Sequence, residues 1–265
     1  MKFKRLIYSF ITLFFVCSGS LVFADPHCDK LTATGNSEYP PYLWRKGGGS
    51  KELLGANQII IDEISKRLGI EIELQDVGSW ARAQDMLKAG RIDLMAGAFF
   101  TIPRVQYMDY VHPAFLETES VIWLKGNSGV KINKKEDLKP FLGVTVINNS
   151  FGQAFDEYSK AELNIMYVSS LAQAFKMLDR GRAEYALYEK NPGKAYANIL
   201  GFEDLSVKGA PISTEGLFLT ISHLSECNTP QLRGQLAQII HELLEEDYMQ
   251  KALRQGLESW QEFNN

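Results

Sequence analysis

The feature of this sequence that most constrains its fold is a regular alternation of short apolar runs with amphipathic stretches of helical period. The runs expected to form strands lie at 31–34, 70–74, 92–96, 121–124, 143–147, 166–168, 185–188 and 217–221. The stretches expected to form helices lie at 57–68, 80–89, 150–160, 171–179, 192–200, 231–244 and 248–260. Strands that alternate with helices indicate an α/β fold with mostly parallel sheets. In such sheets, ligands bind beyond the carboxyl ends of the strands.

The first 24 residues predict a cleavable secretory signal peptide. Three basic residues lie within the first five positions, an apolar run follows over 6–16, and the segment ends in Val22-Phe23-Ala24. The run is shorter than the ~20 apolar residues that a membrane-spanning helix requires. We therefore expect a mature chain that begins near Asp25 and is exported.

The charge of the chain argues against two classes of partner. The formal net charge is −4, and removing residues 1–24 takes away three basic residues and no acidic ones, which leaves −7. An acidic protein is poorly suited to bind nucleic acid or an anionic membrane surface. We expect neither of these partners.

Sequence motifs for enzyme, metal and phosphate chemistry are missing. The four histidines are scattered without the spacing of a metal site. The run Gly47–Gly49 lacks the lysine and the helix start of a phosphate-binding loop, so we expect a hairpin loop there. There is also no Gly-x-Ser-x-Gly elbow. We expect no cofactor, no metal and no enzymatic activity.

Two cysteines remain in the mature chain, Cys28 near its start and Cys227 near its end. Exported thiols form disulfides where geometry allows it. We predict a Cys28–Cys227 disulfide that encloses almost the whole mature chain. The alternative is a pair of free, buried cysteines.

The segment that follows the strand candidate at 92–96 carries the chemistry of an anion site. The strand breaks at Gly97 into a turn that offers backbone N–H groups, a hydroxyl at Thr101 and a guanidinium at Arg104. A carboxylate has two acceptor oxygens, and it suits several donors with one bidentate arginine. The alternative is that Arg104 is a surface arginine after the turn at Pro103.

A series of short motifs extends along nearly the whole mature chain. They are Tyr39–Tyr42, Leu54-Gly55, Trp80, Gly90–Asp93, Thr101–Arg104, Tyr110–Pro113, Gly181–Glu184 and Glu189. In this order and spacing they resemble the bacterial extracellular solute-binding proteins of family 3, the periplasmic amino-acid-binding components of ABC importers.

The resemblance implies a two-lobed periplasmic-binding-protein fold of type II. In this fold, two mostly parallel sheets flanked by helices are joined by two crossover strands, and the lobes close on a ligand. Lobe 1 would comprise residues 25–122 plus 222–265, and lobe 2 residues 123–221. The predicted disulfide would then lie within lobe 1.

The resemblance also implies roles for residues of lobe 1. Arg104 would bind a ligand carboxylate, Thr101 would support the turn, and the Gly97 region would supply backbone contacts. Phe99 departs from the family pattern, because a hydroxyl residue usually precedes the arginine by five positions. Arg82 either lies at the surface or adds a second cation near the cleft, which would suit a ligand with an additional acidic group.

Four further residues complete the implied site. Tyr39 and Trp80 would flank the ligand, although an inward-facing tryptophan on a helix is more often a core residue. Ser150 would begin a helix in lobe 2 whose N-terminal amides contact the carboxylate. Glu189 would pair with the ligand ammonium group, unless it is a solvated carboxylate at a strand end.

Together these observations favour a monomeric, non-enzymatic binding protein. We expect it to capture a small amino-acid-like or carboxylate ligand between two closing lobes and to deliver it to an inner-membrane ABC permease. Two alternatives remain open. One is a periplasmic enzyme of the dehydratase type on the same fold, with Glu189 as general acid. The other is a sensor component that presents its ligand to a membrane receptor.

Overall fold

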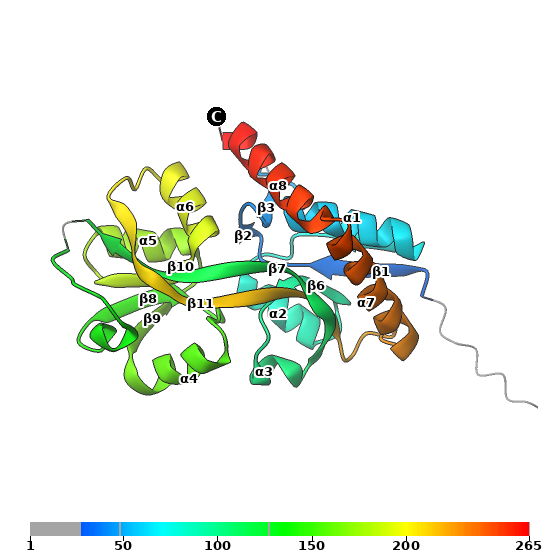
Figure 1. The fold of residues 1–265 in the computed structure, drawn as a ribbon, viewed down its shortest axis with the longest axis horizontal. Coiled ribbons are helices and arrows are strands. Elements are labelled where there is room, and N and C mark those ends of the chain that lie inside the picture. The colour runs from blue at the N-terminus through cyan, green and yellow to red at the C-terminus, as the bar shows by residue number, and fades with distance from the viewer. Residues whose placement is uncertain (1–27, 48, 127, 265) are drawn as a thin grey trace, which may run out of the picture.

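The computed structural model describes residues 28–47, 49–126 and 128–264 of the chain. The predicted signal peptide, residues 1–24, lies outside the described residues. Figure 1 shows two groups of helices and strands side by side, connected by two long strands. Within the described residues, none of the helices combines the length and the apolar character that spanning a membrane would require.

The elements follow one another in the α/β order that the sequence predicts. The strands are β1 (Lys30–Thr34), β2 (Glu38–Tyr39), β3 (Leu43–Arg45), β4 (Leu53–Leu54), β5 (Glu71–Leu74), β6 (Leu94–Ala98), β7 (Met108–Lys125), β8 (Leu142–Val146), β9 (Asn164–Val168), β10 (Tyr185–Glu189) and β11 (Leu205–Ser222). The helices are α1 (Ala56–Leu68), α2 (Trp80–Lys88), α3 (Ile102–Val105), the 3-10 helix η1 (Lys135–Leu138), α4 (Gln153–Glu162), α5 (Leu171–Asp179), α6 (Lys190–Ile199), α7 (Pro230–Glu245) and α8 (Tyr248–Asn264). The α/β class is confirmed.

The large sheet has eight strands in the order β5-β1-β6-β11-β7-β10-β8-β9. We use "first lobe" for the part with β1, β5 and β6, and "second lobe" for the part with β8, β9 and β10. Within each lobe these strands are parallel, whereas β7 and β11 pair with each other and with their neighbours in antiparallel fashion. The two sheets that we expected are therefore one continuous sheet. The predicted division of the chain at 122/123 and 221/222 stays a prediction, since β7 and β11 extend unbroken across both lobes.

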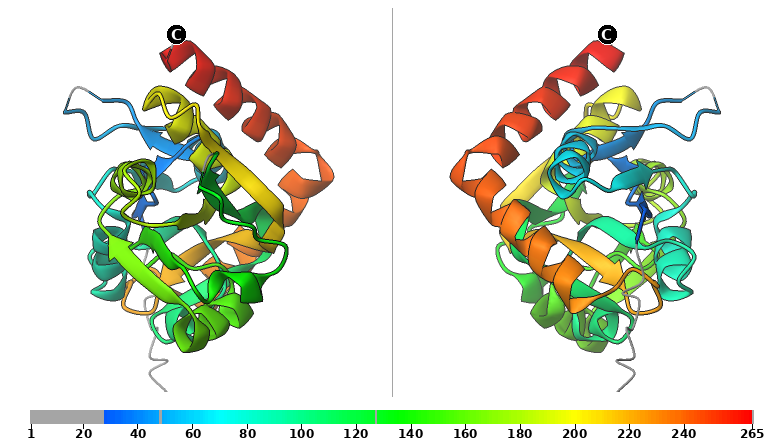
Figure 2. Two further views of the ribbon diagram at one scale, coloured as in Figure 1. Left: turned by 90° about the vertical axis from the view of Figure 1, so that its left-hand side faces the viewer. Right: turned by 90° about the vertical axis from the view of Figure 1, so that its right-hand side faces the viewer.

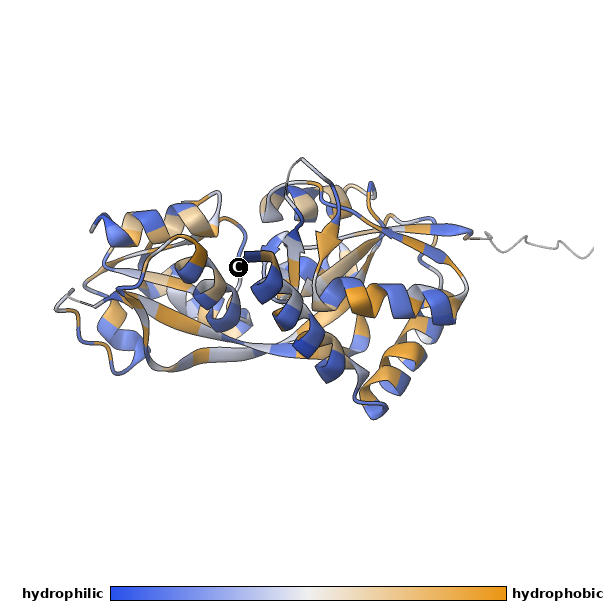
Figure 3. Cartoon of the chain, turned by 90° about the horizontal axis from the view of Figure 1, so that it is seen from above, coloured by the Kyte–Doolittle hydropathy of each residue, from blue (hydrophilic) through white to orange (hydrophobic). Residues whose placement is uncertain are grey.

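The helices pack on the sheet through apolar stripes, and Figure 3 shows hydrophobic and hydrophilic residues sharing the helices around it. In α1 the side chains of Ile60, Ile61 and Ile64 are buried, and the helix ends at Gly69 with φ 72°. Ser79 caps α2 by accepting a hydrogen bond from the backbone N–H of Arg82. The sequence carries both of these signals within the helical segments themselves. The bounds of α1 and α2 agree with the predicted bounds to within one residue.

The C-terminal helix α8 crosses from the first lobe to the second. It packs along α1, and Figure 2 shows its C-terminal end beside α6 of the second lobe. There the Trp260 ring stacks on Tyr196, with centroids 6.5 Å apart, while its edge meets Trp44 at 5.3 Å. The two lobes are thus in contact on this side of the molecule as well as through their shared sheet.

Three predicted details differ in the structure. The strand expected at 92–96 is β6, two residues later, and Gly97 lies inside it rather than after it. The helix expected to begin at Ser150 begins at Gln153 instead. A small antiparallel sheet, β2-β3-β4, was not predicted, and Gly47 and Gly49 lie between its strands β3 and β4.

The predicted disulfide is present: Cys28 and Cys227 are bonded, with their Cα atoms 5.5 Å apart. It joins the start of β1 to the loop before α7, both in the first lobe. A crosslink across 199 residues greatly restricts the unfolded chain, so the disulfide stabilises the fold chiefly through the unfolded state.

We predict that replacing both cysteines, Cys28→Ser with Cys227→Ser, lowers the free energy of unfolding by about 2–5 kcal/mol. Urea unfolding of the mature chain at pH 7 measures the change, and wild-type protein in excess reductant should show the same loss. A midpoint that neither treatment moves would contradict the prediction.

Candidate functional site

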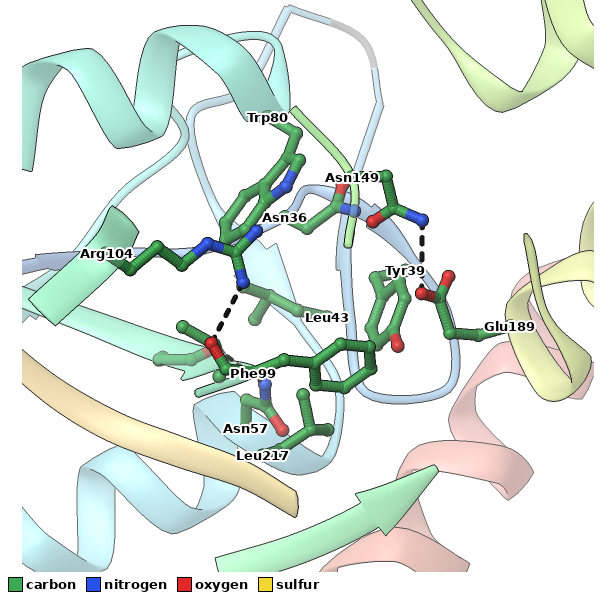
Figure 4. Close-up of a pocket in the computed structure, with 13 residues that line it drawn as sticks. Asn36, Tyr39, Leu43, Asn57, Trp80, Phe99, Arg104, Asn149, Glu189 and Leu217 are labelled. Carbon is green, nitrogen blue, oxygen red and sulfur yellow. Dashed lines mark hydrogen bonds between the residues drawn. The ribbon is translucent and has the colours of Figure 1, made fainter. Parts of the chain in front are cut away.

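A small cavity of about 20 Å³, lined mostly by buried residues, lies between the lobes. Figure 4 shows its walls. They are formed by Asn36, Tyr39, Leu43, Asn57, Trp80, Ala96, Gly97, Ala98, Phe99, Arg104, Asn149, Glu189 and Leu217. Several of these residues lie at or just beyond the carboxyl ends of β1, β6, β8 and β10, where ligands bind in parallel sheets.

Arg104 is held rigidly in the wall of the first lobe. It is 5% exposed, although arginine is seldom buried, and it follows β6 in the short helix α3. One terminal nitrogen donates to the Phe99 carbonyl at 3.0 Å and the other to the Asn148 carbonyl at 3.1 Å. The Trp80 ring lies 5.5 Å from the guanidinium carbon, a cation–π distance. A guanidinium has five N–H groups, so further donors remain for a ligand carboxylate.

The Asn148 carbonyl connects the second lobe to three donors of the first. Besides Arg104, it accepts hydrogen bonds from Trp80 Nε1 at 3.1 Å and from Gln84 Nε2 at 3.2 Å. Asn148 adopts a left-handed backbone conformation with φ 61° at the end of β8. This one carbonyl draws the second lobe against the arginine side of the cavity.

Glu189 provides the only negative charge among the residues that line the cavity. It is the last residue of β10 and is fully buried. Its Oε1 accepts a hydrogen bond from Asn149 Nδ2 at 3.1 Å, whereas Oε2 has no partner among the described residues. Burial raises the pKa of this carboxyl to about 7, although its own backbone N–H, the Asn149 hydrogen bond and the charge of Arg104 lower it.

Aromatic and apolar groups form the rest of the wall. The Tyr39 ring packs at right angles to Tyr188, with centroids 6.2 Å apart, and burial raises the pKa of both phenols well above the usual value. Phe99 replaces the hydroxyl residue expected from the resemblance, and its ring faces the cavity (Figure 4). Its carbonyl accepts from Arg104 and, at 2.8 Å, from the Tyr110 hydroxyl. Phe99 thus orients the arginine through its backbone.

Two predicted residues, Thr101 and Ser150, line an adjoining hollow rather than the cavity. The prediction that Ser150 begins a helix is wrong, because α4 starts three residues later, after Gly152 with φ 84°. The Ser150 hydroxyl instead hydrogen-bonds the Asp156 carboxylate, which also accepts from the Phe151 backbone N–H. The backbone N–H of Gly152, the residue before α4, donates to the Ser150 hydroxyl at 3.2 Å. Any role of Ser150 in binding stays a prediction.

The other six predicted residues lie around one cavity. They are Tyr39, Trp80, Gly97, Phe99, Arg104 and Glu189. Arg82 is exposed and lines a separate groove on the first lobe, which agrees with its interpretation as a surface arginine. Within the described residues, no group of three histidine, cysteine or acidic side chains lies close enough to hold a metal ion.

The sequence analysis missed seven residues that line the cavity. They are Asn36, Leu43, Asn57, Ala96, Ala98, Asn149 and Leu217. Asn36 and Asn149 follow the carboxyl ends of β1 and β8, so the rule that ligands bind at strand ends would have found them. Asn57 gave no such signal, because a polar residue in the first turn of a helix is usually solvated.

The family model of the bacterial extracellular solute-binding proteins, family 3, matches residues 31–258. This chain belongs to that family. A curated relative from Haemophilus influenzae, a probable amino-acid ABC transporter-binding protein, is 23% identical over 153 residues. The alignment covers 57% of this chain and only 56% of the relative.

Solved structures of similar fold match most of this chain. One is the substrate-binding protein of an amino acid ABC transporter, with a TM-score of 0.71, 22% identity and coverage of 86% of this chain and 99% of the other. Another is a histidine kinase sensor domain with similarity to periplasmic binding proteins, with a TM-score of 0.73, 18% identity and coverage of 86% and 96%. At these identities the likeness establishes the fold, which is the predicted two-lobed one.

The raised pKa of the buried Glu189 carboxyl predicts how the stability of the protein depends on pH. Its pKa is raised in the folded state, so the folded protein keeps this proton between about pH 4.5 and 7 while the unfolded chain releases it. Glu189 therefore favours folding at low pH, and this contribution is lost as the pH rises to 7. A shift from 4.5 to about 7 corresponds to about 3 kcal/mol.

We expect Glu189→Gln to be more stable than wild type at pH 8, by up to about 3 kcal/mol, and equal to it near pH 4. Urea unfolding across this range measures the difference, with Glu157→Gln on the exposed face of α4 as the control. A constant difference at every pH would count against a raised pKa.

Proposed function

We propose that this protein is an exported binding protein for a small amino acid. The proposal rests on one observation: Arg104 and Glu189, of opposite charge, line one buried cavity from the two lobes. An α-amino acid is a zwitterion whose carboxylate suits the guanidinium and whose ammonium group suits the unpartnered Glu189 oxygen. Membership of the family and the name of the curated relative support the same class of ligand.

Ligand binding and lobe closure would be linked, because the two charged side chains, Arg104 and Glu189, belong to different lobes. A buried carboxylate with one hydrogen bond is costly, and a cation beside it relieves that cost. A zwitterion held by both lobes makes contacts in the closed arrangement that it lacks in an open one. It would therefore shift the equilibrium toward closure.

We propose further that the closed protein delivers its ligand to an inner-membrane ABC permease in the periplasm. The family description places its members outside the cell, and the curated relative is named as an ABC transporter-binding protein. Residues 1–24 would direct export as a cleaved signal peptide.

One observation favours a second candidate, an enzyme with Glu189 as general acid. A carboxyl whose pKa is about 7, buried opposite an arginine, is protonated often enough at neutral pH to donate a proton. Incubation of the protein with each ligand that it binds, followed by chromatography, separates the candidates. Formation of a product in amounts that exceed the protein supports the enzyme, and recovery of unchanged ligand supports the binding protein.

A thermal-shift screen over amino acids and small carboxylates tests the proposed function. A ligand that binds the folded state alone stabilises it by about 2.7 kcal/mol at a concentration 100 times its Kd, so a true ligand raises Tm. We expect Arg104→Ala to weaken binding of that ligand roughly 100-fold, because its carboxylate loses charge-assisted hydrogen bonds in a desolvated cavity.

The matched control is Arg82→Ala, an exposed arginine on the same lobe, whose affinity should equal that of wild type. Calorimetry measures both. Equal affinity of Arg104→Ala and wild type would refute the assignment of the site.

The proposed contact of Glu189 with an ammonium group predicts a pH dependence of affinity. Binding an ammonium group requires the ionised carboxylate, and below pH 7 the protonated glutamic acid must first release its proton. We expect Kd to rise up to tenfold for each pH unit from 7 to 5 and to be flat from 7 to 8. Calorimetry in buffers of different ionisation enthalpy should detect proton release at pH 6 and not at pH 8.

A further inference from the structure

Asn57 is a second buried side chain whose hydrogen bonding is incomplete. It lies in the first turn of α1 and is 2% exposed. Its Nδ2 donates to the Ala96 carbonyl at 2.8 Å, which fixes the orientation of the amide because a carbonyl only accepts. Its Oδ1 then has no partner among the described residues, although it belongs to a residue that lines the cavity.

Gly97 leaves the space that Asn57 needs in this position. A Cβ atom on residue 97 would lie 2.9 Å from Asn57 Nδ2, and the backbone there has φ 104°, which side chains rarely allow. The amide of Asn57 therefore packs directly against β6, and Figure 4 shows it at one side of the cavity with Phe99 and Leu217 beside it.

The cavity as a whole offers two unpartnered acceptors at separate places. One is Glu189 Oε2 from the second lobe, and the other is Asn57 Oδ1 from the first. The remaining amides are used within the protein: Asn36 donates to the Tyr188 hydroxyl and accepts from the Glu38 backbone N–H, and Asn149 donates to Glu189. Leaving a buried acceptor unpaired is unfavourable, so each of the two acceptors favours a ligand that brings a donor.

The charges of the lining residues restrict the kind of donor at Asn57. Arg104 and Glu189 are the charged side chains of the wall, and both are assigned above to the carboxylate and the ammonium group of a zwitterion. A ligand side chain with its own positive charge would be buried without a counter-charge, and a carboxylate there would face the Asn57 oxygen. Leu43 and Leu217 add apolar surface.

We propose that Asn57 is a specificity-determining residue and that its Oδ1 accepts a hydrogen bond from an uncharged hydroxyl or amide on the ligand side chain. The ligands are then small, uncharged polar α-amino acids. This deepens the proposed function and rests on it. Recognition of such a donor rejects analogues that lack it, because the site's acceptor is left unpaired.

The test compares matched ligand pairs on the wild-type mature protein by calorimetry. L-Threonine against L-valine and L-serine against L-alanine differ by one hydroxyl, and O-methyl-L-serine keeps the oxygen but has no donor. We expect the hydroxyl ligands to bind at least about tenfold tighter than their partners, and O-methyl-L-serine to bind as weakly as L-alanine. The asparagine and glutamine amides should also favour binding.

The variant Asn57→Leu should remove the difference within each pair while still binding the apolar ligand. Gln58→Leu, on the same helix and away from the cavity, should retain the difference. A pair difference that persists in Asn57→Leu, or that is absent in wild type, overturns this proposal alone. Tighter binding of arginine or glutamate than of the uncharged ligands also overturns this proposal alone. If no amino acid binds wild type, the proposed function itself fails, and if Asn57→Leu does not fold, the wild-type ligand pairs decide.

Discussion

The antiparallel pairing of β7 with β11 is the interaction on which the rest of this structure depends. Each strand has 18 residues, and the two are hydrogen-bonded in both lobes, so the sheet of one lobe continues into the sheet of the other. Their register shifts between Lys208 and Ser213 and again between Leu217 and Leu219. Such irregularities bend and twist a strand pair locally. The β7–β11 pair thus connects the two lobes, and its irregularities allow the strands to run in different directions in each lobe.

This connection determines where the chemistry lies. Because the parallel strands of each lobe abut a shared antiparallel pair, their carboxyl ends meet at a common cleft. β6 brings Arg104 to it, and β10 ends in Glu189 itself. The Asn148 carbonyl, just after β8, accepts from Arg104 and Trp80 and so holds the two lobes together beside the cavity. In this arrangement of the lobes both side chains are buried, and burial raises the pKa of Glu189.

The elements that the sequence predicted correctly are those whose signals lie within the element's own residues. The periodic helices α1 and α5 were predicted to within a residue, because apolar spacing and the stop at Gly69 lie within the segment itself. Ser150 misled because a serine before a polar, helix-forming run is typical of a helix cap. In the structure, Gly152 delays the helix and Asp156 binds the serine hydroxyl instead.

The remaining differences from the prediction have non-local causes. The predicted two-lobed fold is confirmed, but the sheets of its lobes are continuous because of the β7–β11 pairing, which joins residues about 100 positions apart and leaves no pattern in either segment alone. Asn57 could not be identified as a cavity residue, since its burial depends on β6 packing against α1 and on the missing side chain of Gly97. Of the predicted residues that do line the cavity, Gly97 and Arg104 were first identified from the donor groups of the turn after a predicted strand. The other four, Tyr39, Trp80, Phe99 and Glu189, came from the order of motifs along the chain.

Recognition of the ligand class and recognition of the individual ligand therefore depend on different parts of the cavity. Arg104 and Glu189 can bind the carboxylate and ammonium groups that all α-amino acids share, so they contribute equally to every member of the class. In the proposed site, discrimination comes from other groups of the wall, and among its residues only Asn57 and Glu189 carry a buried side-chain atom without a partner. An unsatisfied acceptor discriminates more sharply than an apolar wall, because a missing methylene leaves only a small gap whereas a missing donor leaves a buried polar atom unpaired.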